Sequence, residues 1–566
     1  MSTQNLRSPQ APETAMRRRI AAAVAATFVT TLTTGGALAF EFDTGNPDLT
    51  MRWDNTGRFN YAVRVESRDD KIGNSAIADE GTYSFDRGDA VATRFDLLTE
   101  LDVVYRKVHG LRLSAAGWYD AAYEAESKTN PNAPFTNIPS YENKQYSPYT
   151  KRYYRGPSGE LLDAFAFTRF DLGPVPTSVK AGRHTLYWGE SLFLGGNLHS
   201  VAYAQNPLDL QKGFATPGTE AKELFRPLSQ ISVQAQLSES VSVAAQYLLE
   251  WESFRYPEGG TYLGPVDFAF NGPDRQFISG ALGFAQRGDP IEPKQRGEWG
   301  VSARWSPAWL DGTLGVYYRN FADKLPQTFL TQVAANNSRY SLIYADDIDL
   351  WGISFAKSIA GVSVGAEVSY RHNTPLASQV LGISPGLPAQ GETNGPRGDT
   401  YHALINGLGL ISKTPVFDSA NWAVELVWSR WAKVKSGENL FNAVGYAPCT
   451  NRDKWDGCVT KNYVGIGLSF NPTWFQVLPG VDLSAPVTYT RGLYGNAATV
   501  FGGNEANGNY TVGIGADIQQ KYRVDLKYVD FIGRYRNNGT AVTTQNGFTT
   551  LLKDRGFVSL TVKAAF

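Results

Sequence analysis

The sequence predicts an all-β protein: a closed antiparallel transmembrane β-barrel of about 18 strands (roughly 16–20), with long external loops and short periplasmic turns. Three observations predict it. From residue 50 onward, stretches of about ten residues alternate apolar and polar side chains, short connections alternate with long polar ones, and the last strand ends on Phe566. The composition agrees, because 13% of the residues are aromatic and only 19% are charged, below the roughly 25% of soluble domains.

The first 39 residues have the form of a secretory signal peptide. Residues 17–19 are three arginines, residues 20–38 are apolar, and Ala37-Leu38-Ala39 is the small-x-small pattern that signal peptidase cleaves. An uncleaved anchor is disfavoured because polar, acidic sequence follows directly. We therefore expect residues 1–39 to be removed and residues 40–566 to form the barrel, since no other stretch approaches the roughly 18 apolar residues of a spanning helix.

The expected strands carry one apolar and one polar face. In residues 95–105 the odd positions are mostly apolar, whereas Asp96, Glu100 and Asp102 share the other face. Residues 111–123, 362–371 and 522–528 repeat this alternation. In a membrane barrel one face meets lipid and the other the lumen, but a soluble β-sandwich has the same local pattern.

Connection lengths separate these two architectures. Short connections are expected at residues 107–110, 173–176, 238–240, 307–312, 358–361, 414–420, 471–480 and 519–521. Long polar stretches are expected at residues 124–159, 252–295, 373–399, 434–461 and 533–556. Strict alternation of short and long indicates a membrane barrel with both termini in the periplasm.

The closing strand gives the most specific signal. Apolar residues occupy every second position up to the last residue of the sequence: Val558, Leu560, Val562, Ala564 and Phe566. An aromatic residue at this position resembles the signal that the outer-membrane barrel assembly machinery reads, so that machinery is an expected partner. Aromatic residues near expected turns, such as Trp305, Trp309 and Phe475, fit an interfacial girdle in contact with outer-membrane lipid and lipopolysaccharide.

Both cysteines, Cys449 and Cys458, lie in one polar stretch. In an exported protein such a pair is expected to form a local disulfide. A metal site would need further ligands, and no histidine lies nearby in the sequence.

Three segments carry a resemblance to a known family. They are residues 182–193 (GRHTLYWGESLF), 206–209 (NPLD) and 217–223 (PGTEAKE). They closely resemble the signature of the bacterial outer-membrane family filed as domain of unknown function 1302, and Trp188-Gly189-Glu190-Ser191 is the most specific part. The resemblance covers essentially the whole mature chain and implies a bacterial outer-membrane location.

The resemblance also implies partners and a class of function. Members are often accompanied by a periplasmic partner of unknown function and by an inner-membrane transporter of the resistance-nodulation-division type. We therefore expect a channel or transport protein for a small hydrophobic or amphipathic solute.

Residues 184–227 are the expected site of selectivity. The stretch follows a strand, is too long for a tight turn, and mixes charged, aromatic and glycine residues, so it is expected to fold inward as a constriction or plug. Packing on the rim is the alternative. The candidate constriction or solute-binding residues are Arg183, His184, Trp188, Glu190, Ser191, His199, Asp209, Glu220 and Lys222.

Other classes of function fit the sequence less well. The net charge of −1 argues against a nucleic-acid partner, and no cofactor, metal site or enzymatic activity is expected. One alternative is an outer-membrane hydrolase that uses Ser191 with a histidine, His184 or His199. The other is a structural or adhesive barrel that acts through its external loops. A buried Ser–His pair would favour the hydrolase, and a lumen blocked at all depths the structural barrel.

Overall fold

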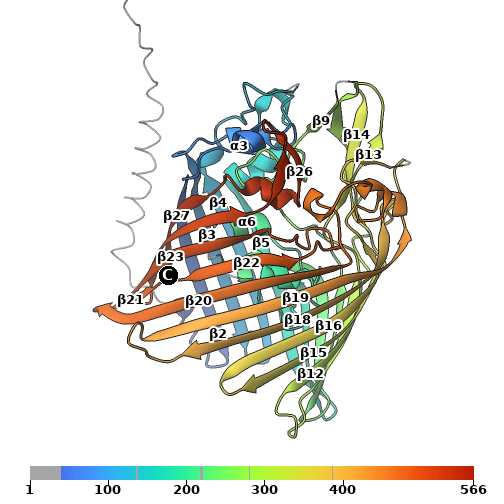
Figure 1. Ribbon diagram of the computed structural model, residues 1–566. Coiled ribbons are helices and arrows are strands. Elements are labelled where there is room, and N and C mark those ends of the chain that lie inside the picture. The colour runs from blue at the N-terminus through green and yellow to red at the C-terminus, as the bar shows by residue number, and fades with distance from the viewer. Residues whose placement is uncertain (1–39, 136–137, 217–218, 220, 280, 385) are drawn as a thin grey trace, which may run out of the picture.

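The strands form one closed barrel (Figure 1). The structure is a computed structural model that describes residues 40–566, except 136–137, 217–218, 220, 280 and 385. The expected signal peptide, residues 1–39, lies outside the described residues. Each barrel strand pairs antiparallel with its two neighbours, and the ring closes where β27 (Phe557–Ala565) pairs with β2 (Leu49–Arg64).

The barrel has eighteen strands within the described residues, so the predicted fold class is confirmed. The fifteenth strand is broken at residues 485–486 into β21 and β22. Between β2 and β27 the remaining strands are β3 (Ala90–Tyr105), β4 (His109–Asp120), β5 (Ser158–Leu172), β6 (Val175–His184), β7 (Leu228–Gln236), β8 (Val241–Leu248), β11 (Trp299–Trp305), β12 (Thr313–Phe321), β15 (Ile348–Ile359), β16 (Val362–Pro375), β18 (Arg397–Ile411), β19 (Ser419–Ser436), β20 (Asn462–Leu478), β21 (Val481–Ser484), β22 (Val487–Tyr494), β23 (Gly508–Ile518) and β24 (Tyr522–Ile532).

Short turns and long loops alternate as the sequence predicts, with one difference. Turns such as 106–108 and 519–521 lie at one end of the barrel, and the long loops lie at the other. Residues 471–480 were expected to be a connection, but β20 continues to Leu478 and only residues 479–480 turn. The strand continues because Ser419–Asn421 and residues 481–484 pair with it on both sides.

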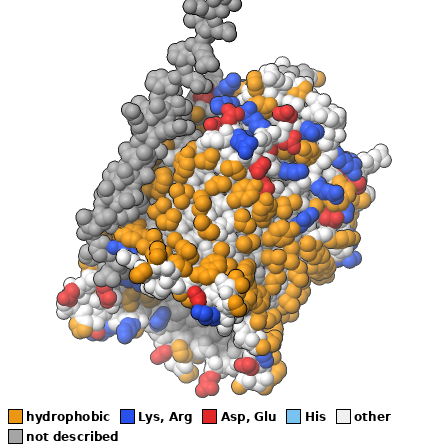
Figure 2. All heavy atoms as spheres, turned by 60° about the vertical axis from the view of Figure 1, so that its left-hand side comes forward, with side chains coloured by type: hydrophobic (Ala, Val, Ile, Leu, Met, Phe, Trp, Pro, Cys, Tyr) orange, Lys and Arg blue, Asp and Glu red, His pale blue; other side chains and the backbone are white. Residues whose placement is uncertain are grey.

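The outer face of the barrel is apolar. Figure 2 shows a broad hydrophobic surface on this side of the barrel, with most of the charged side chains above and below it. Outward side chains of the strands such as Ile353 (59%) and Ile514 (62%) are exposed, and Trp309 and Phe475 are exposed near the turns. A closed barrel with such a band is a protein of the bacterial outer membrane.

The inner face is polar, as strand alternation requires. In β27 the outward Leu560 is exposed, whereas Ser559 and Thr561 are buried and donate hydrogen bonds to the side-chain oxygen of Asn60 on β2. Phe566 exchanges two backbone hydrogen bonds with Asn55 of β2 (2.8 and 2.9 Å). The end of the chain is therefore part of the barrel seam.

The long loops form a compact cap on one end of the barrel. It contains the sheet β17-β13-β14-β10-β9, the hairpin β25–β26 (Tyr535–Asn537 and Val542–Gln545), and the helix α3 (Asp79–Tyr83). The sheet strands are β9 (Arg275–Ser279), β10 (Gly283–Arg287), β13 (Gln327–Gln332), β14 (Ser338–Ile343) and β17 (Gly382–Ile383). Among the described residues, no helix is long and apolar enough to cross a membrane.

Candidate functional site

Residues 184–227, here called the inner segment, leave the wall at the end of β6 and return to it at the start of β7. They contain three short helices: α5 (Leu194–Asn197), α6 (Leu210–Ala215) and α7 (Ala221–Leu224). Figure 1 shows α6 within the outline of the barrel wall. The hydrogen bonds of the segment establish which parts of the wall it contacts.

Two carboxylates of the wall hold backbone N–H groups of the inner segment. Glu367 on β16 accepts from the backbone nitrogens of Glu190 and Val201, the latter at 2.9 Å. Glu425 on β19 accepts from the nitrogens of Leu192 (2.7 Å) and Phe193 (3.2 Å). Hydrogen bonds to a carboxylate are about twice as strong as neutral ones, so these contacts anchor the segment firmly.

Glycines let the backbone approach these carboxylates. A Cβ at Gly189 would collide with the side chain of Glu367, and a Cβ at Gly196 would collide with that of Glu425. Gly189 also has a φ of +92°, which L side chains rarely adopt. Two of the glycines in the segment are thus required by the contacts with the wall.

Two arginines of the wall hold backbone carbonyl groups of the same stretch. Arg319 on β12 donates to the carbonyls of Val201 (3.0 Å) and Tyr203 (2.7 Å). Arg371 on β16 donates to the carbonyls of Leu198 (3.0 Å) and Ser200 (3.1 Å), and its guanidinium lies 4.0 Å from the ring centre of Tyr203. The wall therefore binds the first half of the segment through both its backbone N–H groups and its backbone carbonyl groups.

The second half contacts the opposite side of the ring. Glu223 forms an ion pair with Arg58 of β2 at 2.9 Å. Asp209 forms one at 3.2 Å with Arg255, which also pairs with Glu160 of β5 at 2.7 Å. Since β2 and β16 lie on opposite sides of the ring, the inner segment spans the interior.

The predicted site residues have different surroundings. Glu190 receives a hydrogen bond from Ser354 and faces Arg304 at 3.6 Å. The buried ring of Trp188 lies 6.1 Å from that of Tyr317. These residues share the interior of the barrel.

His199 and Asp209 also lie inside. His199 contacts His402 (Nδ1 to Nδ1, 3.1 Å), and its Nε2 donates to the Gly502 carbonyl (2.7 Å). The carboxylate of Asp209 caps α6 by accepting from the nitrogen of Lys212.

Arg183 lies apart from this group. Arg183 pairs with Glu250 (2.6 Å) and Glu252 (2.9 Å), on the face of β6 opposite to His184. Glu220 and the side chain of Lys222 lie outside the described part of the chain.

The hydrolase alternative depends on Ser191. Its hydroxyl is hydrogen-bonded to that of Tyr187 (2.5 Å), and no bond from it to a histidine is found among the described residues. His184 does contact a serine, Ser232 (2.8 Å), but its other nitrogen lies at the Gly182 carbonyl rather than at a carboxylate. This histidine therefore lacks the carboxylate that orients the base in a Ser-His-Asp triad.

The wall residues that hold the inner segment were not among the predicted site residues. The alternation in residues 362–371 correctly places Glu367 and Arg371 on the polar face of their strand, but it does not indicate what they bind. Their partners are backbone groups more than 160 residues away in the sequence. No spacing rule connects such positions.

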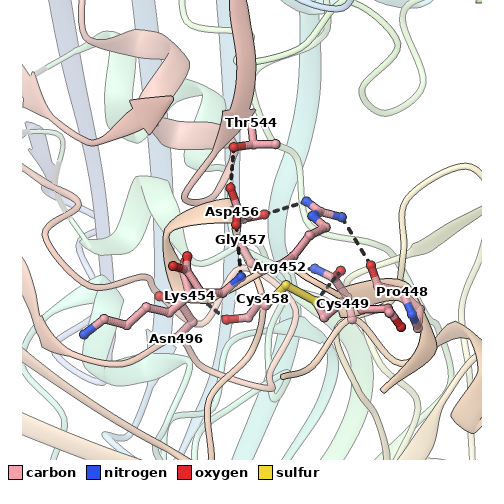
Figure 3. Close-up of a disulfide and its surroundings, with 12 residues drawn as sticks. Pro448, Cys449, Arg452, Lys454, Asp456, Gly457, Cys458, Asn496 and Thr544 are labelled. Carbon is pink, nitrogen blue, oxygen red and sulfur yellow. Dashed lines mark hydrogen bonds between the residues drawn. A yellow bond between two sulfur atoms is a disulfide. The ribbon is translucent and has the colours of Figure 1, made fainter. Parts of the chain in front are cut away.

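The predicted disulfide between Cys449 and Cys458 is confirmed (Figure 3). The loop that it closes is bound to two other loops of the cap. Asp456 accepts a hydrogen bond from Thr544 (2.6 Å), and Asn496 donates to the carbonyls of Lys454 (2.7 Å) and Cys458 (2.8 Å).

Comparison with known proteins gives one family match. The model of a family described as "Protein of unknown function (DUF1302)" matches residues 19–566. No curated protein matches the chain.

Solved structures give weak likenesses. The Acinetobacter baumannii protein OccAB4 is 9% identical with a TM-score of 0.41, over 92% of this chain and 100% of that one. Pseudomonas aeruginosa OpdK, solved with vanillate, is 10% identical with a TM-score of 0.38, over 91% and 98%. The outer membrane channel DcaP of Acinetobacter baumannii is 10% identical with a TM-score of 0.36, over 93% and 99%. At these scores we infer neither fold nor function from the likeness.

Proposed function

The chain belongs to the DUF1302 family of proteins of unknown function, and from that premise we propose that it is an outer-membrane channel for a small hydrophobic or amphipathic solute. The observation that carries the proposal is the inner segment, which is held across the interior by wall residues on opposite sides. A segment of backbone fixed inside a barrel narrows the lumen, and the side chains at the narrowest part decide which solutes pass.

The chemistry of this region supports an amphipathic solute. Two large apolar side chains of the segment are exposed, Tyr187 (39%) and Leu192 (40%). Charged groups lie beside them, because Glu190 faces Arg304. Ligand sites typically combine an apolar lining with a few polar groups in this way.

A periplasmic partner and an inner-membrane transporter are part of the same proposal. They rest on the family resemblance alone. Co-purification of the protein from cross-linked cells, with the partners identified by mass spectrometry, tests them separately from the channel.

A deletion tests the role of the inner segment. Removing residues 195–200 takes away the backbone that Arg371 holds and should raise conductance in a planar bilayer and increase entry of bulky solutes. Because the deletion also leaves a buried guanidinium without partners, a milder variant is needed. Glu425→Gln weakens two charge-assisted hydrogen bonds, each worth about 1.5–3 kcal/mol, and should raise conductance and current noise.

Asp163→Asn is the matched control. Asp163 lies on β5 and contacts Arg112 and Ser114, not the inner segment, so this variant removes the same charge from the lumen wall. A larger effect of Glu425→Gln than of Asp163→Asn supports the proposal. Wild-type conductance and solute entry in both the deletion and Glu425→Gln would contradict it, and the segment would then stabilise the barrel without controlling passage.

A further inference from the structure

A cavity of about 400 Å³ lies in the cap, between loops that are far apart in the sequence. We call it the outer cavity. Its apolar lining comes from at least six loops, represented by Ile77, Val266, Leu381, Val459, Phe501 and Phe548. A mostly apolar hollow of this size, with a few polar groups at its edge, is typical of small-molecule sites.

The charged side chains that line the outer cavity are Arg452 and Asp456, which are opposite in sign. Arg452 donates to the carbonyl of Asp456 (2.7 Å), and the carboxylate of Asp456 accepts from Thr544 and pairs with Arg536. The positive charges of Arg452 and Arg536 are balanced by the negative charges of Asp456 and Asp453. Because a charged group pays a large cost when it leaves water without a partner, the cavity favours a neutral molecule.

Three of the lining residues are held in an unusual backbone conformation. Phe270 (φ 67°), Leu381 (φ 56°) and Phe501 (φ 56°) lie in the left-handed region, which is a genuine outlier for a bulky residue. Among the described residues no other large apolar residue has a positive φ, so all such residues line this one cavity. Unfavourable conformations of this kind persist where the surroundings fix them, and they cluster at ligand sites.

A cluster of three rings contains two of these residues. The ring of Tyr256 lies 5.0 Å from that of Phe270 and 4.9 Å from that of Phe501, and the two phenylalanine rings lie 5.7 Å from each other. Phe268 and Phe548 add an edge-to-face pair at 6.3 Å. Exposed faces and edges of aromatic rings attract flat ring systems.

We propose that the outer cavity is a binding site for a neutral, flat, apolar ring compound at the outer face of the membrane. In placing this compound on a route through the barrel, the proposal rests on the proposed channel function. The outer cavity adjoins the inner segment, because Gly502, which lines the cavity, accepts the hydrogen bond from His199. A bound molecule therefore lies directly outside the inner segment.

The disulfide loop forms one wall of the site. The loop closed by the Cys449–Cys458 disulfide contains three residues that line the cavity: Arg452, Asp456 and Gly457 (Figure 3). The bonds to Thr544 and Asn496 fix this wall against the loops that carry Phe548 and Phe501.

The test is equilibrium dialysis of 2-naphthylmethanol against the full-length mature protein in detergent, with protein-free micelles as the blank. The wild-type protein should bind this neutral probe saturably and should bind 2-naphthoate, its charged counterpart, at least about tenfold more weakly. Val500→Lys places a charge on the cavity wall and should weaken binding of the neutral probe by at least about tenfold.

Val333→Lys is the matched control, because Val333 is 39% exposed on another external hairpin and does not line the cavity. It should bind the probe as the wild type does. Heat-modifiable mobility on a denaturing gel checks that each variant is folded. Val380→Lys, on a different loop, replaces Val500→Lys if that variant does not assemble.

No saturable binding by the wild type, or equal binding by the wild type and the folded lysine variants, would overturn the proposal. Conductance separates it from the channel function. If Val500→Lys loses binding but keeps wild-type conductance, both proposals are supported. If the wild-type protein binds the probe but conducts no ions, the binding site is supported and the channel function is contradicted.

Discussion

The inner segment and the outer cavity lie next to each other but are built in opposite ways. The inner segment is fixed by hydrogen bonds between its backbone and charged side chains of the strands. The outer cavity is fixed by packing between apolar side chains of separate loops, with a disulfide on one wall. Under the two proposals above, the loops bind the solute and the strands hold the segment that sets the passage.

The largest effect is expected at the seam, where both regions depend on a closed barrel. Phe566→Asp should sharply lower outer-membrane abundance, because the exposed aromatic side chain (44%) at the end of β27 lies in the lipid interface and resembles the assembly signal. Immunoblots of outer membranes, with unheated and boiled samples compared on a gel, measure it. Phe566→Tyr keeps the ring and is the control. If the aspartate variant is as abundant in the outer membrane as the wild type, the prediction that Phe566 acts in assembly is wrong.

The next largest effect distinguishes the two regions. Gly196→Val should displace the inner segment from Glu425, at a cost of about 1–3 kcal/mol typical of overpacking, and should raise single-channel conductance without changing binding of 2-naphthylmethanol. Gly195→Val is a close control, because a Cβ at Gly195 has no atom within 4 Å. If the two variants conduct alike, the contact with Glu425 does not set the passage.

A smaller effect with the opposite pattern is expected from the disulfide. Replacing Cys449 and Cys458 by serine loses a local constraint of about 2–3 kcal/mol and should loosen the wall formed by Asp456. We expect weaker binding of 2-naphthylmethanol, by a few-fold, with conductance close to that of the wild type. A change in conductance as large as that of Gly196→Val would mean that the conformation of the inner segment depends on the disulfide loop.

The smallest effect is a pH dependence of the cap. Burial raises the pKa of Glu80 and of Glu258 to about 8. Because the pKa of each carboxyl in the folded protein lies above its ordinary value, the protonated carboxyl favours the folded cap. This stabilisation is complete below about pH 4.5 and is lost as the pH rises through about 8. The charged groups near Glu80 are Asp79, Asp267 and Arg275.

The cap should therefore loosen at alkaline pH. Asp267 adjoins the cavity residues Val266 and Phe268 and accepts from the backbone nitrogen of Glu80, so ionisation of Glu80 should disturb this wall. We expect 2-naphthylmethanol to bind more weakly at pH 9 than at pH 6, and Glu80→Gln should reduce that difference. Binding that is constant over this range would exclude the effect.

Much of the fold could be predicted from the sequence, because strand alternation is a local property. The alternation of apolar and polar side chains predicted the last strand, in residues 558–566, and the turns at 106–108 and 519–521. The connection expected at 471–480 was wrong beyond the turn at residues 479–480, since residues 471–478 continue β20.

The candidate site was less predictable, for a physical reason. The bonds from Glu367 and Arg371 go to backbone groups, which leave no trace in the sequence of the segment that receives them. The left-handed conformation of Phe270, Leu381 and Phe501 depends on packing between three loops. Neither feature has a spacing that a sequence pattern could reveal.

Attachment through the backbone also has an evolutionary consequence. Every residue type except proline offers the same N–H and C=O groups, so Glu367, Glu425, Arg319 and Arg371 can hold the inner segment whatever side chains it carries. Gly189 and Gly196 are the exceptions, because a Cβ there would meet a carboxylate. Exposed side chains between these anchors, such as that of Leu192, can therefore change by point substitution while the backbone bonds that hold the segment stay the same.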